Sequence, residues 1–130
     1  MPLARIAVPH HLPTAKVRAL ADAVHRGLVG TCGVPEKDRF QLVSRFPEGA
    51  MILDPTFPDV ARTGDACVVE IAFLKGRTRE QKRALFRAIA DGAMAAGFAG
   101  DDIFVALVEN GAEDWSLGHG VAYADVVHGG

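Results

Sequence analysis

One pattern of residue types occurs twice in this chain, and it limits the folds that the chain can adopt. Three pairs of residues are separated by 64 positions in a chain of 130, namely Thr14 and Thr78, Gly33 and Gly97, and Asp38 and Asp102. Apolar segments follow both aspartates at the same separation, over residues 40–43 and 104–107. A repeat of this length is typical of one supersecondary unit that has been duplicated. We therefore expect one domain, residues 1–130, with pseudo-repeats over about 1–64 and 65–130.

Strands and helices are expected in the same order in both halves. Apolar stretches predict strands over residues 3–8, 66–73 and 103–109, and the alternation of residue types predicts a further strand over residues 39–46. Apolar residues at helical spacing predict helices from Thr14 to about Gly30 and from Thr78 to about Ala96. We expect the two threonines to cap these helices, and Gly33 and Gly97 to end them.

A helix that connects two strands of one sheet makes those strands parallel. Two such units predict an α+β fold, in which a four-stranded mixed sheet carries two helices on one face. The inward-facing residues of the second helix are expected to be Leu85, Phe86, Ile89 and Ala93. The opposite face of the sheet has no cover within one chain, so association with further copies would bury it. Residues 47–64 are rich in proline, glycine and aspartate, which predicts a loop or a hairpin.

Composition and charge argue against several classes of function. The net charge of −2 argues against a nucleic-acid or anionic-membrane partner. No apolar run approaches the roughly 18 residues of a membrane span, and two cysteines are too few for a disulfide framework. We therefore expect a cytoplasmic protein that binds neither nucleic acid nor membrane. His10 and His11 lack a third ligand at a suitable spacing, so no metal site is expected.

Pro2 directly follows the initiator methionine, and removal of Met1 would leave its nitrogen as a free secondary amine. An α-amino group titrates at about pH 7.7–8.0, so it can accept or donate a proton near neutrality. The apolar strand that follows would hold this amine in place. The counterpart of Pro2 in the second half is Ala66, so only one half offers a free amine. The dipeptide by itself is also a common chain start without any role.

Several short stretches, spread over nearly the whole chain, match one known family. They are residues 1–3, 33–35, 38–40, 80–82, 102–103, 105–110 and 114–116, together with Gly118 and Gly120. With them the chain resembles the tautomerase superfamily, and within it the malonate semialdehyde decarboxylase-like branch. The resemblance implies a homotrimer of tautomerase-like subunits, an enzyme that acts on a small oxo acid, and no metal or organic cofactor.

The resemblance also implies roles for residues near the amine. Pro2 would be the catalytic acid or base, and Asp38 would orient a water molecule or favour the charged form of the amine. Trp115 and Leu117 would form an apolar wall of the substrate pocket. From its spacing alone, Asp38 can equally be a turn residue before a strand, as its counterpart Asp102 indicates.

Two cations before the second helix are implied to bind the substrate carboxylate. The family has two arginines that flank one residue at this place; here Arg77 matches the second, and Lys75 stands at the first. Arginine can bind a carboxylate with two parallel hydrogen bonds, whereas lysine offers a compact point charge. The alternative is that both residues belong to a solvated turn.

The favoured activity is decarboxylation of a 3-oxo acid such as malonate semialdehyde, in which a cationic Pro2 polarises the carbonyl group. Because Lys75 breaks the arginine pair, keto–enol tautomerisation of a 2-oxo acid such as phenylenolpyruvate stays open, with a neutral Pro2 as the base. A third alternative, from a different class, is a non-catalytic binding module on the same scaffold. Retention of Met1 would favour this last alternative, and we expect Met1 to be removed.

Overall fold

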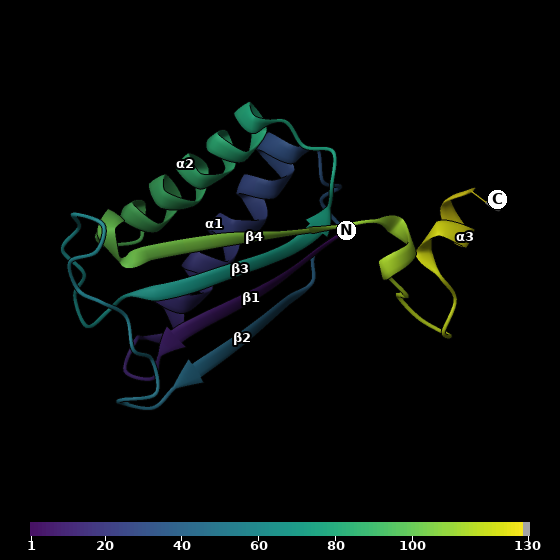
Figure 1. Cartoon of the computed structure of the whole chain (residues 1–130). Helices are drawn as coiled ribbons and strands as arrows, with labels where there is room; N and C mark the ends of the chain where they lie inside the picture. The colour runs from purple at the N-terminus through teal and green to yellow at the C-terminus, as the bar shows by residue number, and fades with distance from the viewer. Residues whose placement is uncertain (129–130) are drawn as a thin grey trace.

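Four strands and two long helices make up the body of the protein, for which a computed structural model describes residues 1–128 (Figure 1). In chain order the elements are β1 (Pro2–Pro9), α1 (Thr14–Cys32), β2 (Gln41–Phe46), β3 (Cys67–Leu74), α2 (Arg79–Ala95), η1 (Gly100–Asp102), β4 (Ile103–Asn110), η2 (Ala112–Asp114) and α3 (Tyr123–His128). The predicted order of strands and helices is confirmed, with boundaries that shift by at most two residues. None of the helices in this part of the chain is long and apolar enough to cross a membrane.

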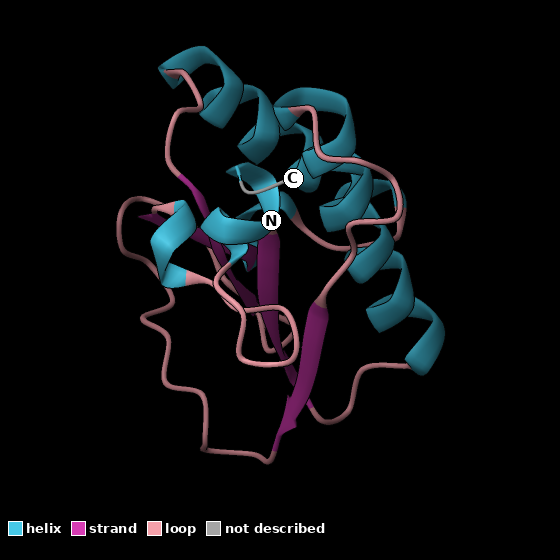
Figure 2. Cartoon of the chain, turned by 90° about the vertical axis from the view of Figure 1, so that its right-hand side faces the viewer, coloured by secondary structure: helices cyan, strands magenta, loops and turns pink. Residues whose placement is uncertain are grey.

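The strands form one sheet in the order β2-β1-β3-β4. β1 pairs in parallel with β2, and β3 with β4, because a crossover helix connects the two strands of each pair. β1 and β3 are antiparallel at the centre, where Arg5 lies opposite Glu70. Both long helices cover the same face of the sheet, which Figure 2 shows from one end. The predicted α+β architecture is therefore confirmed.

The alternation of side chains along β1 and β3 separates a buried face from an open one. The residues buried against the helices are Ala4, Ile6, Val8, Cys67, Val69, Ile71 and Phe73. Burial of one large apolar side chain stabilises the fold by about 1.5–3 kcal/mol, so this layer holds sheet and helices together. The open face carries the half-exposed side chains of Leu42, Phe104 and Val108 around Arg5 and Glu70.

The two long helices begin in different ways. Thr78 caps α2, because its hydroxyl accepts a hydrogen bond from the Gln81 N–H while the Gln81 side chain accepts one from the Thr78 N–H. The prediction that Thr14 caps α1 is wrong, because Pro13 occupies the N-cap position and its side chain has no acceptor. The Thr14 hydroxyl instead accepts a hydrogen bond from Arg45 Nη2 at 3.2 Å.

Phe86 does not face inward; its side chain is 39% exposed, because it lies roughly 100° around the helix from its buried neighbour Leu85. Residues 47–64 contain no strand, so this segment is a loop and not a hairpin.

The separation between corresponding residues of the two halves is not constant. It is 64 residues at the glycines and aspartates, but 65 between the first residues of β1 and β3 and between those of α1 and α2.

The two long helices approach each other closely at Gly92. A Cβ atom placed on Gly92 would lie 2.6 Å from the Cβ of Ala23 and 3.4 Å from its Cα. On the other side of the contact, a Cβ on Gly27 would lie 3.3 Å from Leu85 Cδ1. The separation of α1 and α2 therefore depends on small residues at their contact.

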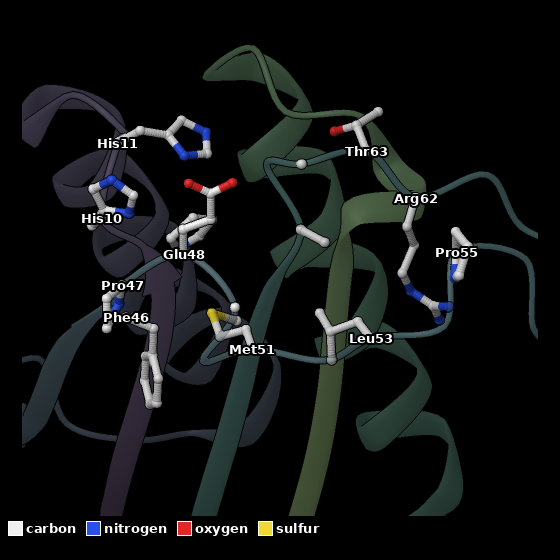
Figure 3. A pocket seen from close by; sticks show the side chains of 14 residues that line it. His10, His11, Phe46, Pro47, Glu48, Met51, Leu53, Pro55, Arg62 and Thr63 are labelled. Carbon is white, nitrogen blue, oxygen red and sulfur yellow. The ribbon is translucent and has the colours of Figure 1, made fainter.

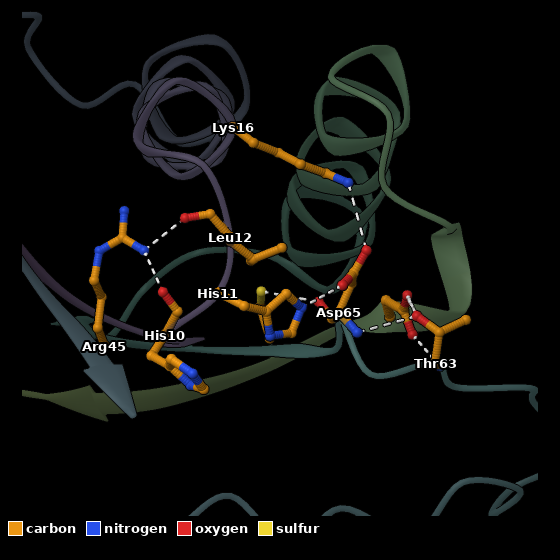
Figure 4. A network of polar contacts seen from close by, with 9 residues as sticks. His10, His11, Leu12, Lys16, Arg45, Thr63 and Asp65 are labelled. Atoms are coloured by element: carbon orange, nitrogen blue, oxygen red, sulfur yellow. Dashed lines mark hydrogen bonds and ion pairs between the residues drawn. The ribbon is translucent and has the colours of Figure 1, made fainter. Parts of the chain in front are cut away.

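A polar network fixes the loop before β3 at the end of the sheet where β1 ends (Figure 4). Asp65 accepts a hydrogen bond from His11 Nε2 at 2.7 Å and lies 3.7 Å from Lys16 Nζ. The hydrogen bond from His11 is the main reason why the pKa of Asp65 lies below its ordinary value. Asp102 accepts hydrogen bonds from both the N–H and the hydroxyl of Thr63. These contacts hold the loop against the end of β1, the start of α1 and η1.

Candidate active site

The N-terminal amine lies beside the carboxylate of Asp38. Met1 N is 2.6 Å from Asp38 Oδ2, and the two side chains are only 6% and 15% exposed. The parallel pairing of β1 with β2 brings these groups together, because both strands start at the same end of the sheet. The Ala4 N–H also donates to the Phe40 carbonyl at 3.0 Å, which fixes the start of β1 beside the turn. A titratable amine and a carboxylate therefore face each other where the sheet begins.

Pro2 is buried at the first position of β1, opposite Phe73 of β3. Proline has no N–H to give to a ladder, so the start of a strand is one of the few places where a sheet accepts it. The Arg77 guanidinium lies over the Phe73 ring, 5.4 Å from the ring centre. Phe73 therefore lies between Pro2 and Arg77, at the same end of the sheet as Asp38.

Arg77 is held by two backbone carbonyl groups. Its Nη1 donates to the Leu74 carbonyl at 3.0 Å, and its Nη2 to the Cys32 carbonyl at 3.4 Å. A guanidinium carries five N–H donors, so donors remain for an anion. The N-terminus of α2 lies two residues further on and adds a field that favours negative charge. This half-buried cation is therefore able to receive a carboxylate.

Lys75, Asn110 and Trp115 meet where β3 and β4 end. The Lys75 N–H donates to the Asn110 carbonyl at 2.8 Å, and Trp115 Nε1 donates to Asn110 Oδ1 at 2.6 Å. The Lys75 side chain is exposed and forms no ion pair with any residue that the structure describes. Asn110 thus connects the predicted cation to the predicted apolar wall. In the sequence, Asn110 is noticeable only as the last residue of the matching stretch 105–110. That match does not reveal that Asn110 contacts both Lys75 and Trp115.

Residues 111–128 form a tail that leaves the sheet at this same end (Figure 1). The Tyr123 N–H donates to the Trp115 carbonyl at 2.7 Å, and α3 packs on η2 within the tail. Trp115 is half-buried, whereas Leu117 is 50% exposed. The structure therefore brings five of the six predicted site residues to one end of the sheet, while Leu117 lies on the surface of the tail.

A cleft of about 510 Å³ lies at the opposite end of the sheet (Figure 3). Its lining includes His10, His11, Phe46, Glu48, Met51, Leu53 and Arg62, and none of the predicted site residues. Arg62 braces the loop here, because its Nη1 donates to the carbonyls of Asp54 and Phe57 and its guanidinium lies 5.9 Å from the centre of the Phe104 ring. Within residues 1–128, no cluster of histidine, cysteine or acidic side chains is arranged to hold a metal ion.

Comparison with known proteins relates nearly the whole chain to one family. A family model described as "Tautomerase enzyme" matches residues 38–118. Probable tautomerase YusQ of Bacillus subtilis (strain 168) is 31% identical over 123 residues, which cover 94% of this chain and 97% of the relative. Probable tautomerase YrdN of the same organism is 33% identical over 123 residues, with 94% and 95% covered.

Solved structures of similar fold include two malonate semialdehyde decarboxylases. The FG41 malonate semialdehyde decarboxylase, inhibited by 3-bromopropiolate, has a TM-score of 0.89 and 34% identity, and the match covers 98% of this chain and 95% of that one. The second, solved as wild type, as a proline-to-alanine mutant and in inactivated form, has decarboxylase and hydratase activities. Its TM-score is 0.86 at 31% identity, with 98% and 97% covered. A fused 4-OT that forms a symmetric trimer shares the fold, with a TM-score of 0.78, 22% identity, and 95% and 98% covered.

Proposed function

Because the chain belongs to the tautomerase family, we propose that it decarboxylates a small 3-oxo acid of the malonate semialdehyde type with the N-terminal amine of Pro2. Its relatives include decarboxylases and tautomerases, so it is an enzyme of the lyase or isomerase type rather than a non-catalytic binding module. The observation that carries the proposal is the 2.6 Å contact between the Met1 amine and Asp38, which places the carboxylate beside the residue that precedes Pro2. Removal of Met1 is part of the proposal, because only then is the Pro2 nitrogen a free amine.

The proposed reaction requires a proton donor at the carbonyl oxygen. When the bond between the α-carbon and the carboxylate breaks, carbon dioxide leaves and the electron pair of that bond moves into the α-carbon and the carbonyl group. A protonated prolyl amine can hydrogen-bond the oxygen and stabilise the enolate that forms. Transfer of a proton from a solvent water molecule to the α-carbon then gives the aldehyde and leaves a hydroxide ion, which the bulk solvent neutralises. The Asp38 carboxylate supports this role because it lies 2.6 Å from the Met1 amine, so it is placed to accept a hydrogen bond from an N-terminal ammonium group at this end of the sheet.

Arg77 and Lys75 are proposed to hold the substrate carboxylate. Arg77 supports this role through its remaining N–H donors and its place over the ring of Phe73, the residue opposite Pro2. Lys75 adds a positive charge at the exposed rim of the site, although an ammonium group orients a carboxylate less strictly than a guanidinium. Trp115, fixed through Asn110, is proposed to cover the apolar side of the substrate.

We also propose that the enzyme is a homotrimer. The open face of the sheet carries the half-exposed side chains of Leu42, Phe104 and Val108, and no helix within residues 1–128 covers them, so a neighbouring subunit could bury them. A fused 4-OT of the same fold forms a trimer. In addition, residues 111–128 leave the body of the subunit at the end where the site lies, so a neighbouring subunit can border that site.

A keto–enol tautomerase that acts on a 2-oxo acid such as phenylenolpyruvate is the second candidate. Two curated relatives, at 31% and 33% identity, are probable tautomerases. The exposed Lys75 also offers a less directional contact than an arginine pair would. In this reaction a neutral Pro2 amine would take a proton from one end of the enol system and return it at the other.

A paired assay tests the proposal. The purified protein, with its N-terminus checked by mass spectrometry, is given malonate semialdehyde and phenylenolpyruvate in separate reactions. We expect the higher kcat/KM with malonate semialdehyde, and we expect Lys75→Arg to raise decarboxylation relative to tautomerisation. A higher kcat/KM with phenylenolpyruvate would favour the second candidate, and no turnover of either compound would refute the proposed substrate class.

A further inference from the structure

We infer that His25 is a positioning residue that holds Asp38 at the N-terminal amine. His25 lies on α1 and is buried, with 7% exposure. Its Nε2 donates a hydrogen bond to the Glu36 carbonyl at 2.8 Å, two residues before Asp38. The histidine therefore ties the helix to the turn that carries the carboxylate. The catalytic consequence of this contact rests on the proposed function, whereas its effect on the turn does not.

Asp38 has few contacts of its own that would fix its side chain. Its Oδ2 accepts a hydrogen bond from the Met1 amine, and its Oδ1 is buried without a hydrogen-bond partner among residues 1–128. Its N–H donates to the Pro35 carbonyl at 3.0 Å, which is a contact inside the turn. The direction of the carboxylate therefore depends on where α1 holds the backbone of this turn.

Three side-chain contacts with α1 hold the turn and the start of β2. One of them, from Gln41 Nε2 to the Ala21 carbonyl at 2.8 Å, lies at the first residue of β2. The other two lie closer, one on each side of Asp38. The contact after it is an ion pair, in which Arg39 Nη2 donates to Asp22 Oδ1 at 2.7 Å. Both partners are more than a third exposed, at 36% and 38%, and exposed ion pairs contribute little to stability. The contact before it is the bond from His25, which is buried and so meets less competition from water. His25 is therefore the stronger of the two anchors.

The second half of the chain forms the same β-α-β unit without such a histidine. Its aspartate, Asp102, is held directly by the N–H and the hydroxyl of Thr63. The positions of α2 that correspond to His25 are Ile89 and Ala90, at separations of 64 and 65, and neither side chain can donate a hydrogen bond. A β-α-β unit of this kind can therefore fold without a buried hydrogen-bond donor on its helix. The donor, His25, occurs only in the first half, whose aspartate faces the N-terminal amine.

Three variants of His25 separate the hydrogen bond from the space that the ring fills. His25→Gln keeps an N–H donor at about the reach of Nε2, His25→Asn carries the same amide one methylene closer to the backbone, and His25→Phe fills the space without a donor. Asp22→Ala, which removes the exposed anchor, is the matched control. Hydrogen exchange of the Asp38 amide, followed by NMR, reports on the turn independently of catalysis.

We expect His25→Asn and His25→Phe to exchange the Asp38 amide about tenfold faster than the wild type, in line with the loss of one buried hydrogen bond. His25→Gln and Asp22→Ala should stay within about twofold of the wild type. Unchanged exchange in His25→Asn and His25→Phe would overturn the inference. So would equally fast exchange in His25→Gln, because the donor would then not be the cause.

The catalytic consequence is measured with whichever oxo acid the wild type turns over. His25→Asn and His25→Phe should lower kcat/KM by about 10- to 100-fold, mainly through kcat, because a misplaced group costs about this much. In an Asp38→Asn background the same substitutions should have no further effect. An equal further loss in that background would overturn the inference, because His25 would then act without Asp38. If the wild type turns over neither acid, the proposed function fails, and the exchange measurement still decides the role of His25.

Discussion

Replacement of Gly92 by alanine should destabilise the protein, although alanine is the better helix former. The new Cβ would lie 2.6 Å from the Cβ of Ala23 and 3.4 Å from its Cα on the facing helix. Carbon atoms make their best contacts at about 3.5–4.0 Å. The Cβ of Ala23 is attached to the backbone and cannot rotate away. The two helices would therefore have to move apart by roughly 1 Å.

Two opposing effects set the size of the change. Alanine is favoured over glycine inside a helix by about 0.8–1.0 kcal/mol. Overpacking of a well-packed contact costs about 1–3 kcal/mol, and a clash with a backbone-fixed atom belongs in the upper half of that range. The net loss in the free energy of unfolding should be roughly 1–2 kcal/mol. In a chain of 130 residues this lowers Tm by about 3–10 °C.

Gly30→Ala is the matched control. Gly30 also lies in a helix, and a Cβ there would meet nothing within 4 Å. This variant should be as stable as the wild type or gain up to about 1 kcal/mol. Urea denaturation at one fixed protein concentration gives the free energies of unfolding of both variants. A Gly92→Ala protein at least as stable as the wild type would refute the close packing of α1 against α2.

Three further outcomes are expected. Burial raises the pKa of the Cys67 thiol to about 12, so this thiol should resist alkylation by iodoacetamide in the folded protein at pH 9. The free energy of unfolding should decline above about pH 8.5, because the thiol ionises there in the unfolded chain but not in the folded one. Thr78→Ala should cost about 1 kcal/mol in urea denaturation because α2 loses its cap, whereas Thr14→Ala, which removes no cap, should cost clearly less. His11→Ala should raise the pKa of Asp65 toward its ordinary value in an NMR carboxyl titration. Because the folded-state pKa is the lower one, this contact stabilises the fold above about pH 4, and the stabilisation is lost as the pH falls through the folded value.

The fold could be predicted from the sequence because its determinants are local. Apolar stretches or alternation predict the strands, helical spacing predicts each long helix, and a crossover helix makes the strands of each unit parallel. The capping threonine shows the limit of such reasoning. Thr14 and Thr78 are related by the repeat, but only Thr78 is followed by a glutamine that completes the capping box.

The contacts around the candidate site were predicted less completely, because they join residues far apart in the chain. Asn110 contacts both Lys75 and Trp115, and His25 contacts the carbonyl of Glu36. Neither contact follows from spacing, since each depends on how a strand end or a helix face meets a turn. The role of Leu117 stays a prediction, because its side chain is exposed on the tail and the motif alone does not specify which surface the tail borders.

The central claim is that the amine of Pro2 is the catalytic acid, and replacement of the proline tests that claim most directly. Pro2→Ala still leaves an N-terminal amine, but a primary one outside the ring of proline. The measurement is kcat/KM with malonate semialdehyde for the wild type and Pro2→Ala, after mass spectrometry has shown that Met1 is absent from both. We predict a loss of about 10²-fold or more, with an unchanged urea denaturation curve. Full activity in Pro2→Ala would contradict the account.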